Sequence, residues 1–134
     1  MLPPVSAEGL REAGALPSMV IDTSPPAVEH WLAEHGEDDG RFTEMLHPAM
    51  LSRASAVILP TRFTFDGPRI HRGLRSAFHA TRPVGTPLTA RGRVTRVWDH
   101  NGHGYVSSEL VVVDDNTHDV VVHLHSESIH RLRV

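Results

Sequence analysis

The stretch LHPAMLSRASAVILP, residues 46–60, decides the fold of this chain. Pro48 suits the first turn of a helix, and Pro60 stops one. Between them, apolar residues cover nearly every side of the helical wheel, and only two serines and one arginine are polar. A helix that is apolar on all sides is enclosed by the rest of its domain. The sequence therefore predicts a central apolar helix from Pro48 to Leu59, with the other elements wrapped around it.

The segments that follow this helix are predicted to be β-strands. Apolar and polar residues alternate in each of them, and turn-forming Pro, Gly, Asn and Asp residues lie between them. The four segments span residues 70–80, 88–98, 104–113 and 118–132. Such alternation is typical of an antiparallel sheet that has one face on a core. A sheet that curls around one helix makes a single α+β domain.

Upstream of the central helix, the chain is predicted to hold a short strand, residues 19–22, and one amphipathic helix. Thr23 or Ser24 caps this helix, two prolines occupy its first turn, and Gly36 ends it. Its buried face follows the i, i+3, i+4, i+7 spacing and is expected to hold Val28, Trp31, Leu32 and His35. Residues 1–15 carry little pattern, so we expect an N-terminal arm there and one domain over residues 16–134.

Composition excludes several classes of function. A chain of 134 residues supports one domain with a core, but not two. It has no cysteine, which excludes disulfides, a thiolate zinc site and a cysteine nucleophile. All 13 basic residues are arginines, which excludes a Schiff-base lysine and a Walker-type phosphate loop. The net charge is -3 and the arginines are scattered, so we expect no nucleic-acid partner.

The sequence also bears on location. No segment reaches the ~18 consecutive apolar residues that a membrane-spanning helix needs. The first residues lack the basic start and apolar run of a secretory signal. We therefore expect no membrane partner and a cytoplasmic location.

Three stretches together resemble a known family. They are LHPAMLSRASAVILP (46–60), IHRGLRSAFHATRPVGTPLTARGRV (70–94) and GYVSSELVVVDDNTHDVVVHLHSESIHRL (104–132). They resemble the MaoC-like hydratase/dehydratase family, most closely its half-domains of fatty-acid-synthase dehydratase type, from about Gly14 to the C-terminus. The resemblance implies a single hot-dog domain that acts on acyl thioesters of coenzyme A or acyl carrier protein. It implies no cofactor, because coenzyme A or phosphopantetheine is part of the substrate.

The catalytic motif of that family is altered in this chain. Active members carry Gly-Asp-x-Asn-Pro-hydrophobic-His before the central helix, with the Asp and His as the acid/base pair. The corresponding segment is GEDDGRF, residues 36–42. By this resemblance, Glu37 stands at the position of the aspartate, Asp39 at that of the asparagine and Phe42 at that of the histidine. The loss of the histidine leaves open whether the site is rewired or inactive.

Water addition to an enoyl thioester needs an acid/base group and donors for the thioester oxygen. The candidates for the acid/base work are Glu37, Asp39 and His47, which directly precedes the predicted helix. The backbone N–H groups of Ala49 and Met50, in the first helical turn, are candidate oxyanion donors. The alternative is that the acidic segment is a solvated turn and that His47 only caps or packs.

The remaining histidines fall into two groups. His71 and His79 lie on the polar face of a predicted strand and are candidates for a cleft between subunits. The second group, His123, His125 and Glu127, projects from one strand face, a mixture that suits zinc or iron. A metal site would need a further clustered ligand, and His130 falls on the opposite, apolar side. We therefore expect no metal.

Four functions remain open from the sequence. The first is a hydratase/dehydratase lyase that acts on an enoyl or 3-hydroxyacyl thioester, in specialised metabolism because its motif is altered. The second is a non-catalytic hot-dog subunit of a heteromeric dehydratase, and the third is a hot-dog thioesterase. The fourth is an isomerase or cyclase with a nuclear-transport-factor-2-like α+β barrel. For a hot-dog domain we expect a homodimer, or a heterodimer with another hot-dog subunit, in which two sheets join edge to edge.

Overall fold

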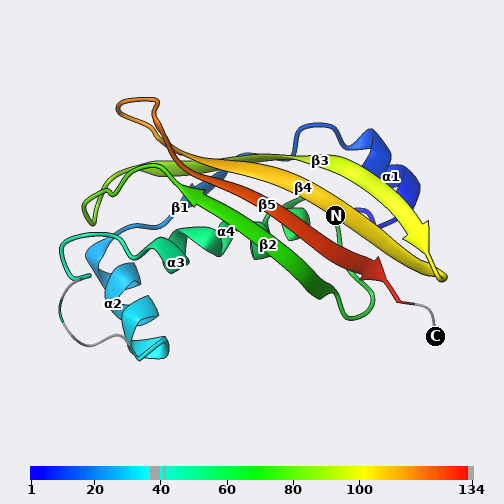
Figure 1. Ribbon diagram of the computed structural model, residues 1–134, viewed down its shortest axis with the longest axis horizontal. Helices are drawn as coiled ribbons and strands as arrows, with labels where there is room; N and C mark the ends of the chain where they lie inside the picture. The colour runs from blue at the N-terminus through cyan, green and yellow to red at the C-terminus, as the bar shows by residue number, and fades with distance from the viewer. Residues whose placement is uncertain (37–39, 41, 133–134) are drawn as a thin grey trace.

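The computed structural model describes residues 1–36, 40 and 42–132 of the chain (Figure 1). Its elements are, in chain order, α1 (Ala7–Glu12), β1 (Met19–Ile21), α2 (Pro25–Glu34), α3 (Pro48–Ser52), α4 (Ala54–Val57), the 3₁₀ turn η1 (Leu59–Thr61), β2 (Ile70–Phe78), β3 (Leu88–His100), β4 (His103–Asp114) and β5 (Val120–Arg131). No helix of the described part of the chain is long and apolar enough to cross a membrane.

The strands form one antiparallel sheet in the order β1-β3-β4-β5-β2. It curls over α3 and α4, as Figure 1 shows. β4 lies in its middle, and Leu110 and Val112 of this strand are buried opposite Leu124 and Val122 of β5. All four strands that we predicted after the central helix are present. The alternation of β5 matches the two faces of a half-buried sheet, whereas β2 is exposed along its whole length.

The central helix differs from the prediction in its continuity. The single helix expected from Pro48 to Leu59 is divided into α3, α4 and η1. Serine hydroxyls at the first division donate to backbone carbonyls: Ser52 to that of Pro48 at 3.4 Å, and Ser55 to that of Ser52 at 2.9 Å. Such bonds compete with regular helical ones. The segment is also not enclosed on every side, since Arg53 is exposed.

The N-terminal segment is not the loose arm that we expected over residues 1–15. Leu10 of α1 is fully buried in the same core as the central helix. Backbone bonds hold both ends of the segment: the N–H of Val5 donates to the carbonyl of Thr64, and that of Leu16 donates to the carbonyl of Gly92, each at 2.8 Å. One buried leucine was too little pattern to detect in the sequence.

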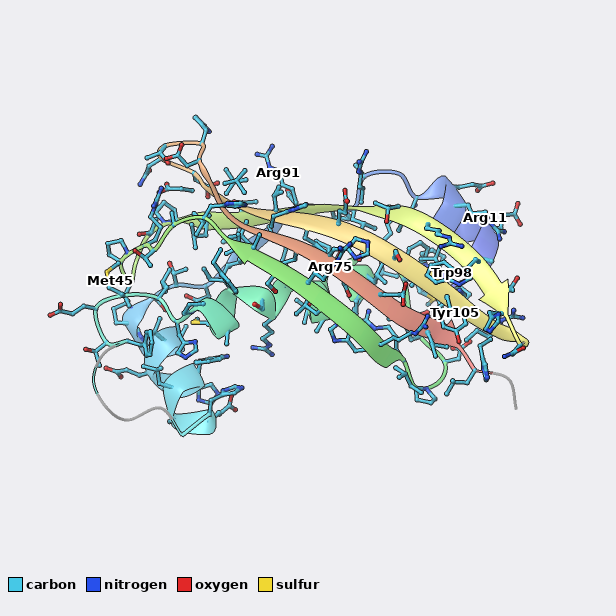
Figure 2. All side chains as sticks on the ribbon, viewed as in Figure 1. Arg11, Met45, Arg75, Arg91, Trp98 and Tyr105 are labelled. Atoms are coloured by element: carbon cyan, nitrogen blue, oxygen red, sulfur yellow. The ribbon has the colours of Figure 1, made fainter. Side chains whose placement is uncertain are left out.

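The outer face of the sheet carries polar and aromatic side chains. Trp98 of β3 stacks on Tyr105 of β4 with 5.3 Å between ring centroids, near the hairpin that joins the two strands (Figure 2). Tyr105 alternates with Val106, which points into the core. The helical layer therefore covers the other face, and the candidate site is built on that layer.

Candidate active site

His47 forms the entry into α3. Its Nδ1 accepts a hydrogen bond from the backbone N–H of Ala49 at 3.0 Å, so the imidazole caps the helix. A ring nitrogen that accepts a hydrogen bond carries no proton, and in the neutral ring the proton then lies on Nε2. The cap therefore selects the tautomer in which Nε2–H is a donor. The capping role that we considered as the alternative for His47 is confirmed.

The two predicted oxyanion donors already have acceptors within the chain. The N–H of Ala49 bonds to the His47 ring, and the N–H of Met50 donates to the carbonyl of His47 at 3.1 Å. A substrate oxygen would have to share or displace these bonds. Pro48, at the first helical position, has no N–H to offer in their place.

An aromatic stack surrounds His47. The Trp31 ring lies 4.9 Å from that of His47, and the Phe42 ring lies 4.3 Å from it on another side. His35 stacks on Trp31 at 4.1 Å and 15°, and its Nδ1 lies 2.8 Å from the Trp31 carbonyl oxygen. The sequence placed Trp31 on a buried face, which is confirmed, but it did not show that two histidines flank this side chain.

A cavity of about 350 Å³ lies beside this stack, between β1, α2, α3 and α4. Trp31 and Met50 link the surroundings of His47 to this cavity. Trp31 contacts the His47 ring, and Trp31 and Met50 both line the cavity. The cavity has apolar walls and a polar rim that includes Arg53 and the pair His30–Glu34, whose Nε2 and Oε1 atoms are 3.1 Å apart. Its volume falls at the lower end of the range for small-molecule sites.

Sequence reasoning missed these rim residues. The signal for His30 and Glu34 was present, because residues four apart on a helix lie side by side. The signal for Arg53 was also present, because the cavity residues of this segment, Met50, Arg53, Ala54 and Val57, follow the i, i+3, i+4, i+7 spacing of one helix face.

The turn over residues 82–87 holds the helix entry in place. The N–H of Leu46, just before His47, donates to the carbonyl of Arg82 at 2.9 Å. The N–H of Gly85 donates to the carbonyl of Thr23, just before α2, at 2.8 Å. Gly85 has φ +90, a conformation that favours glycine. One turn thus positions both the helix that carries Trp31 and the loop that carries His47.

Two solved structures decide how this arrangement is classified. The monoamine oxidase regulatory protein of Archaeoglobus fulgidus matches with a TM-score of 0.79 and 10% identity over 100% of both chains. The (R)-hydratase of A. caviae involved in PHA biosynthesis matches with a TM-score of 0.69 and 14% identity, over 86% of this chain and 93% of that one. The chain has the hot-dog fold.

A third hot-dog structure is the C-terminally truncated HadBC complex, a (3R)-hydroxyacyl-ACP dehydratase from Mycobacterium tuberculosis. It matches with a TM-score of 0.66 and 16% identity, over 87% of this chain and 93% of that one. No protein-family model matches the sequence, and neither does any curated protein. The predicted resemblance to MaoC-like hydratases and dehydratases is therefore confirmed at the level of the fold. The hot-dog fold excludes the α+β barrel of the fourth function.

Within this hot-dog domain, the predicted carboxylates Glu37 and Asp39 lie outside the described residues. Phe42, which stands at the position of the family's histidine, packs on His47. The structure thus brings together His47, Ala49 and Met50 from the predicted set.

His71 and His79 do not join this group. Strand β2 separates them, and eight residues at about 3.3 Å each place them roughly 25 Å apart. His71 is exposed, and its Nε2 lies 3.2 Å from Oγ of the buried Ser126. A bulge in β2 between His71 and Gly73 shifts the alternation. His79 is exposed beyond the end of β2, where its N–H donates to the carbonyl of Val121.

The group His123, His125 and Glu127 lies on the outer face of β5. Glu127 is engaged in an ion pair with Arg72, with a distance of 3.0 Å between Oε2 and Nη1. Among the residues that the structure describes, no group of three or more His, Cys, Asp or Glu side chains could hold a metal ion.

Proposed function

We propose that this chain is a hydratase or dehydratase that adds water to a 2-enoyl thioester or removes it from a 3-hydroxyacyl thioester. The carrier would be coenzyme A or acyl carrier protein, and no cofactor beyond the substrate's own would be needed. The observation that carries the proposal is the His47 imidazole, oriented by its cap beside a cavity in a hot-dog domain. A cytoplasmic location stays a prediction.

The chemistry of hydration requires two proton movements. A base takes a proton from water while the water oxygen bonds to the β-carbon, and an acid delivers a proton to the α-carbon. His47 is oriented with Nε2–H as a hydrogen-bond donor, which suits it to stabilise the charge that develops on the thioester oxygen. Glu37 in this proposal takes the proton from water as the base and then, as the protonated carboxyl, delivers it to the α-carbon, with Asp39 as its helper; both assignments rest on the family resemblance. The oxyanion role of Ala49 and Met50 stays a prediction that requires their present bonds to be shared.

One observation favours a second function, a non-catalytic hot-dog subunit. Phe42 stands at the position of the family's histidine, and its ring occupies one side of His47. The HadBC structure is a complex, so hot-dog subunits of this kind do associate. In this alternative the chain shapes a substrate cavity for a partner that holds the complete motif.

The exposed edge of the sheet supports association with another hot-dog subunit. All nine residues of β2 are exposed, and β2 has a neighbour, β5, on one side only. The strand carries three large apolar side chains, Ile70, Leu74 and Phe78, with exposed fractions of 43%, 39% and 47%. Unpaired backbone groups on an apolar edge strand favour pairing with a second sheet. We propose a homodimer, or a heterodimer with another hot-dog subunit, formed along β2.

The experiment that tests the proposal follows loss of the enoyl chromophore on a short enoyl-CoA and on the matching enoyl-carrier protein, with a thiol reagent in parallel. His47→Asn is the informative variant, because asparagine is a good helix cap but has no imidazole. We expect a loss of turnover of about 10²-fold or more, in the range for the loss of one oxyanion donor. His123→Asn, on the outer face, is the matched control and should keep wild-type turnover. Glu37→Gln tests the base.

Two other results of this assay would assign a different function. Thiol release would assign the chain to the hot-dog thioesterases. No turnover by the folded wild-type protein on either substrate would overturn the lyase and favour the non-catalytic subunit.

A further inference from the structure

A second cavity, of about 870 Å³, lies at the other end of the sheet. Its walls come from the turn before α1, the loop before β2, and the last residues of β3 and β5. The first cavity adjoins β1, which pairs with β3 at Ala90, whereas Asp99 of the second cavity is nine residues further along β3. At about 3.3 Å per residue this is roughly 30 Å of strand. Figure 1 shows α2 and the end of β5 at opposite ends of the molecule.

His130 forms part of the wall of this cavity. Only 7% of this residue is exposed, and neither Nδ1 nor Nε2 has a hydrogen-bond partner among the residues that the structure describes. Burying a polar group without a partner costs stability, and native proteins rarely keep one without a reason. A phenyl ring would fill similar space without that cost. Packing alone therefore does not account for a histidine at this position.

The position of the ring is well defined by its surroundings. A Cβ atom on residue 104 would lie 2.8 Å from both Cε1 and Nε2 of His130, so only glycine leaves room for the imidazole. Gly104 belongs to β4 and His130 to β5, two central strands of the sheet. The imidazole is thus held in place on a rigid support, as a binding group should be.

The charged side chains around His130 balance one another, so they do not favour a charged ligand of either sign. Asp99 and Arg131 are paired with each other, with 2.8 Å between Oδ1 and Nη2. Asp66 also lines the cavity, and Arg11 acts on the ring from α1. Burial lowers the pKa of His130, and the neighbouring Arg131 lowers it further. The ring is therefore neutral near pH 7, with one N–H donor and one nitrogen acceptor.

We propose that this second cavity binds a small uncharged molecule whose hydroxyl or amide group forms a hydrogen bond with His130. A hydroxyl or primary amide both donates and accepts, so it can pair with an unpartnered ring nitrogen of His130 in either tautomer. The apolar body of the ligand would lie against Val5, Pro68 and Leu132, which line the same cavity. This site is independent of the proposed lyase activity, and it requires no second subunit.

The test is an NMR titration of the full chain with cyclohexanol and isobutyramide as neutral probes, and with isobutyrate and isobutylamine as charged ones. The neutral probes should shift the ring signals of His130 saturably, and the charged ones should bind at least tenfold more weakly. His130→Phe should weaken binding of the neutral probes at least tenfold. His130→Gln, which keeps one donor and one acceptor, should bind better than the phenylalanine variant. His123→Phe is the matched control and should bind like the wild type.

Three results of the titration would overturn the proposal. They are the absence of saturable shifts at His130, equal binding of charged and neutral probes, and unchanged binding in a folded His130→Phe variant. Proton contacts between bound probe and the His130 ring in the wild-type protein provide a measurement that does not depend on how the variants fold. A long-lived water at the ring that no probe displaces would also overturn it.

Discussion

At the scale of single residues, the surroundings of each histidine decide what its imidazole does. The Nδ1 of His47 accepts from a backbone N–H at a helix start, and the ring lies within an aromatic stack. The ring of His130 is buried between strands, with no partner among the described residues. Sequence alone predicted that His47 precedes a helix and that His130 points to the apolar side. It could not predict the missing partner of His130, which depends on segments far apart in the chain.

Burial of His130 predicts a loss of stability on acidification. Its pKa is lowered in the folded protein, chiefly by burial and then by Arg131, while Asp99 opposes the shift. The unfolded chain, with an ordinary pKa of about 6.5, therefore binds the proton more readily. The contribution of the neutral His130 ring to the free energy of unfolding is present above about pH 6.5. It is lost as the pH falls from there through the folded pKa of His130. Denaturant unfolding at pH 7.5 and 5.5 measures it.

Replacement of the ring isolates this contribution. His130→Phe should show a smaller difference between the two pH values than the wild type, because its side chain does not titrate. His123→Phe, which removes an exposed histidine, should keep the wild-type difference. An identical pH dependence in the His130→Phe protein would show that other groups cause it.

Asp114 predicts a second, separate pH effect. Its Oδ2 accepts from Nε of Arg82 at 2.7 Å, and its Oδ1 accepts from the N–H of Asn116 at 2.8 Å. The hydrogen bond from Arg82 is the largest cause that lowers the pKa of Asp114. Its contribution to stability is present above the ordinary carboxyl pKa of about 4. It is lost as the pH falls from there through the lowered folded pKa.

We expect Asp114→Asn to lower the denaturation midpoint at pH 7, because asparagine can keep the turn bonds but not the ion pair. Asp119→Asn is the matched control, since Asp119 is exposed and lies 3.3 Å from the same guanidinium. Equal midpoints for the two variants would contradict a special role of Asp114 in holding the turn over residues 82–87.

At the scale of elements, hydrophobic pattern predicted which segments are helix and strand better than where they are interrupted. Alternation in the strand segments reflects one buried face, which is a local property of the sequence. The central helix is interrupted because Ser52 and Ser55 bond to nearby carbonyls. Apolar pattern does not report such bonds. The interruption does not change the face that lines the first cavity, since Met50, Arg53, Ala54 and Val57 keep the spacing of one helical face.

The first helix supplies a prediction at this scale. If α1 is part of the domain, Leu10→Ala should destabilise the protein by about 2–5 kcal/mol, the usual cost of truncating a buried leucine. Leu2→Ala is the matched control, because 40% of Leu2 is exposed. Denaturant unfolding compares the two. A loss below about 0.5 kcal/mol for Leu10→Ala would fit a loose arm instead.

At the scale of the whole molecule, the exposed β2 edge predicts a dimer. The purified chain should sediment with twice its own mass, and Leu74→Glu should shift it to the monomer because it puts a charge on the apolar edge. Thr95→Glu, at an exposed position of β3, is the matched control and should leave the dimer intact. A wild-type monomer would contradict the homodimer and direct the search to a second hot-dog subunit.

The sequence by itself determined the element types, the apolar central segment and the α+β class, because each depends on local periodicity and turn chemistry. It also indicated the family resemblance and the altered motif. Tertiary structure alone decided the sheet order, the aromatic stack around His47 and both cavities, because these join residues that are distant along the chain. The same holds for the bulge in β2 and for the contact of His71 with Ser126 beside it. Long-range packing selects such contacts, and no local pattern encodes them.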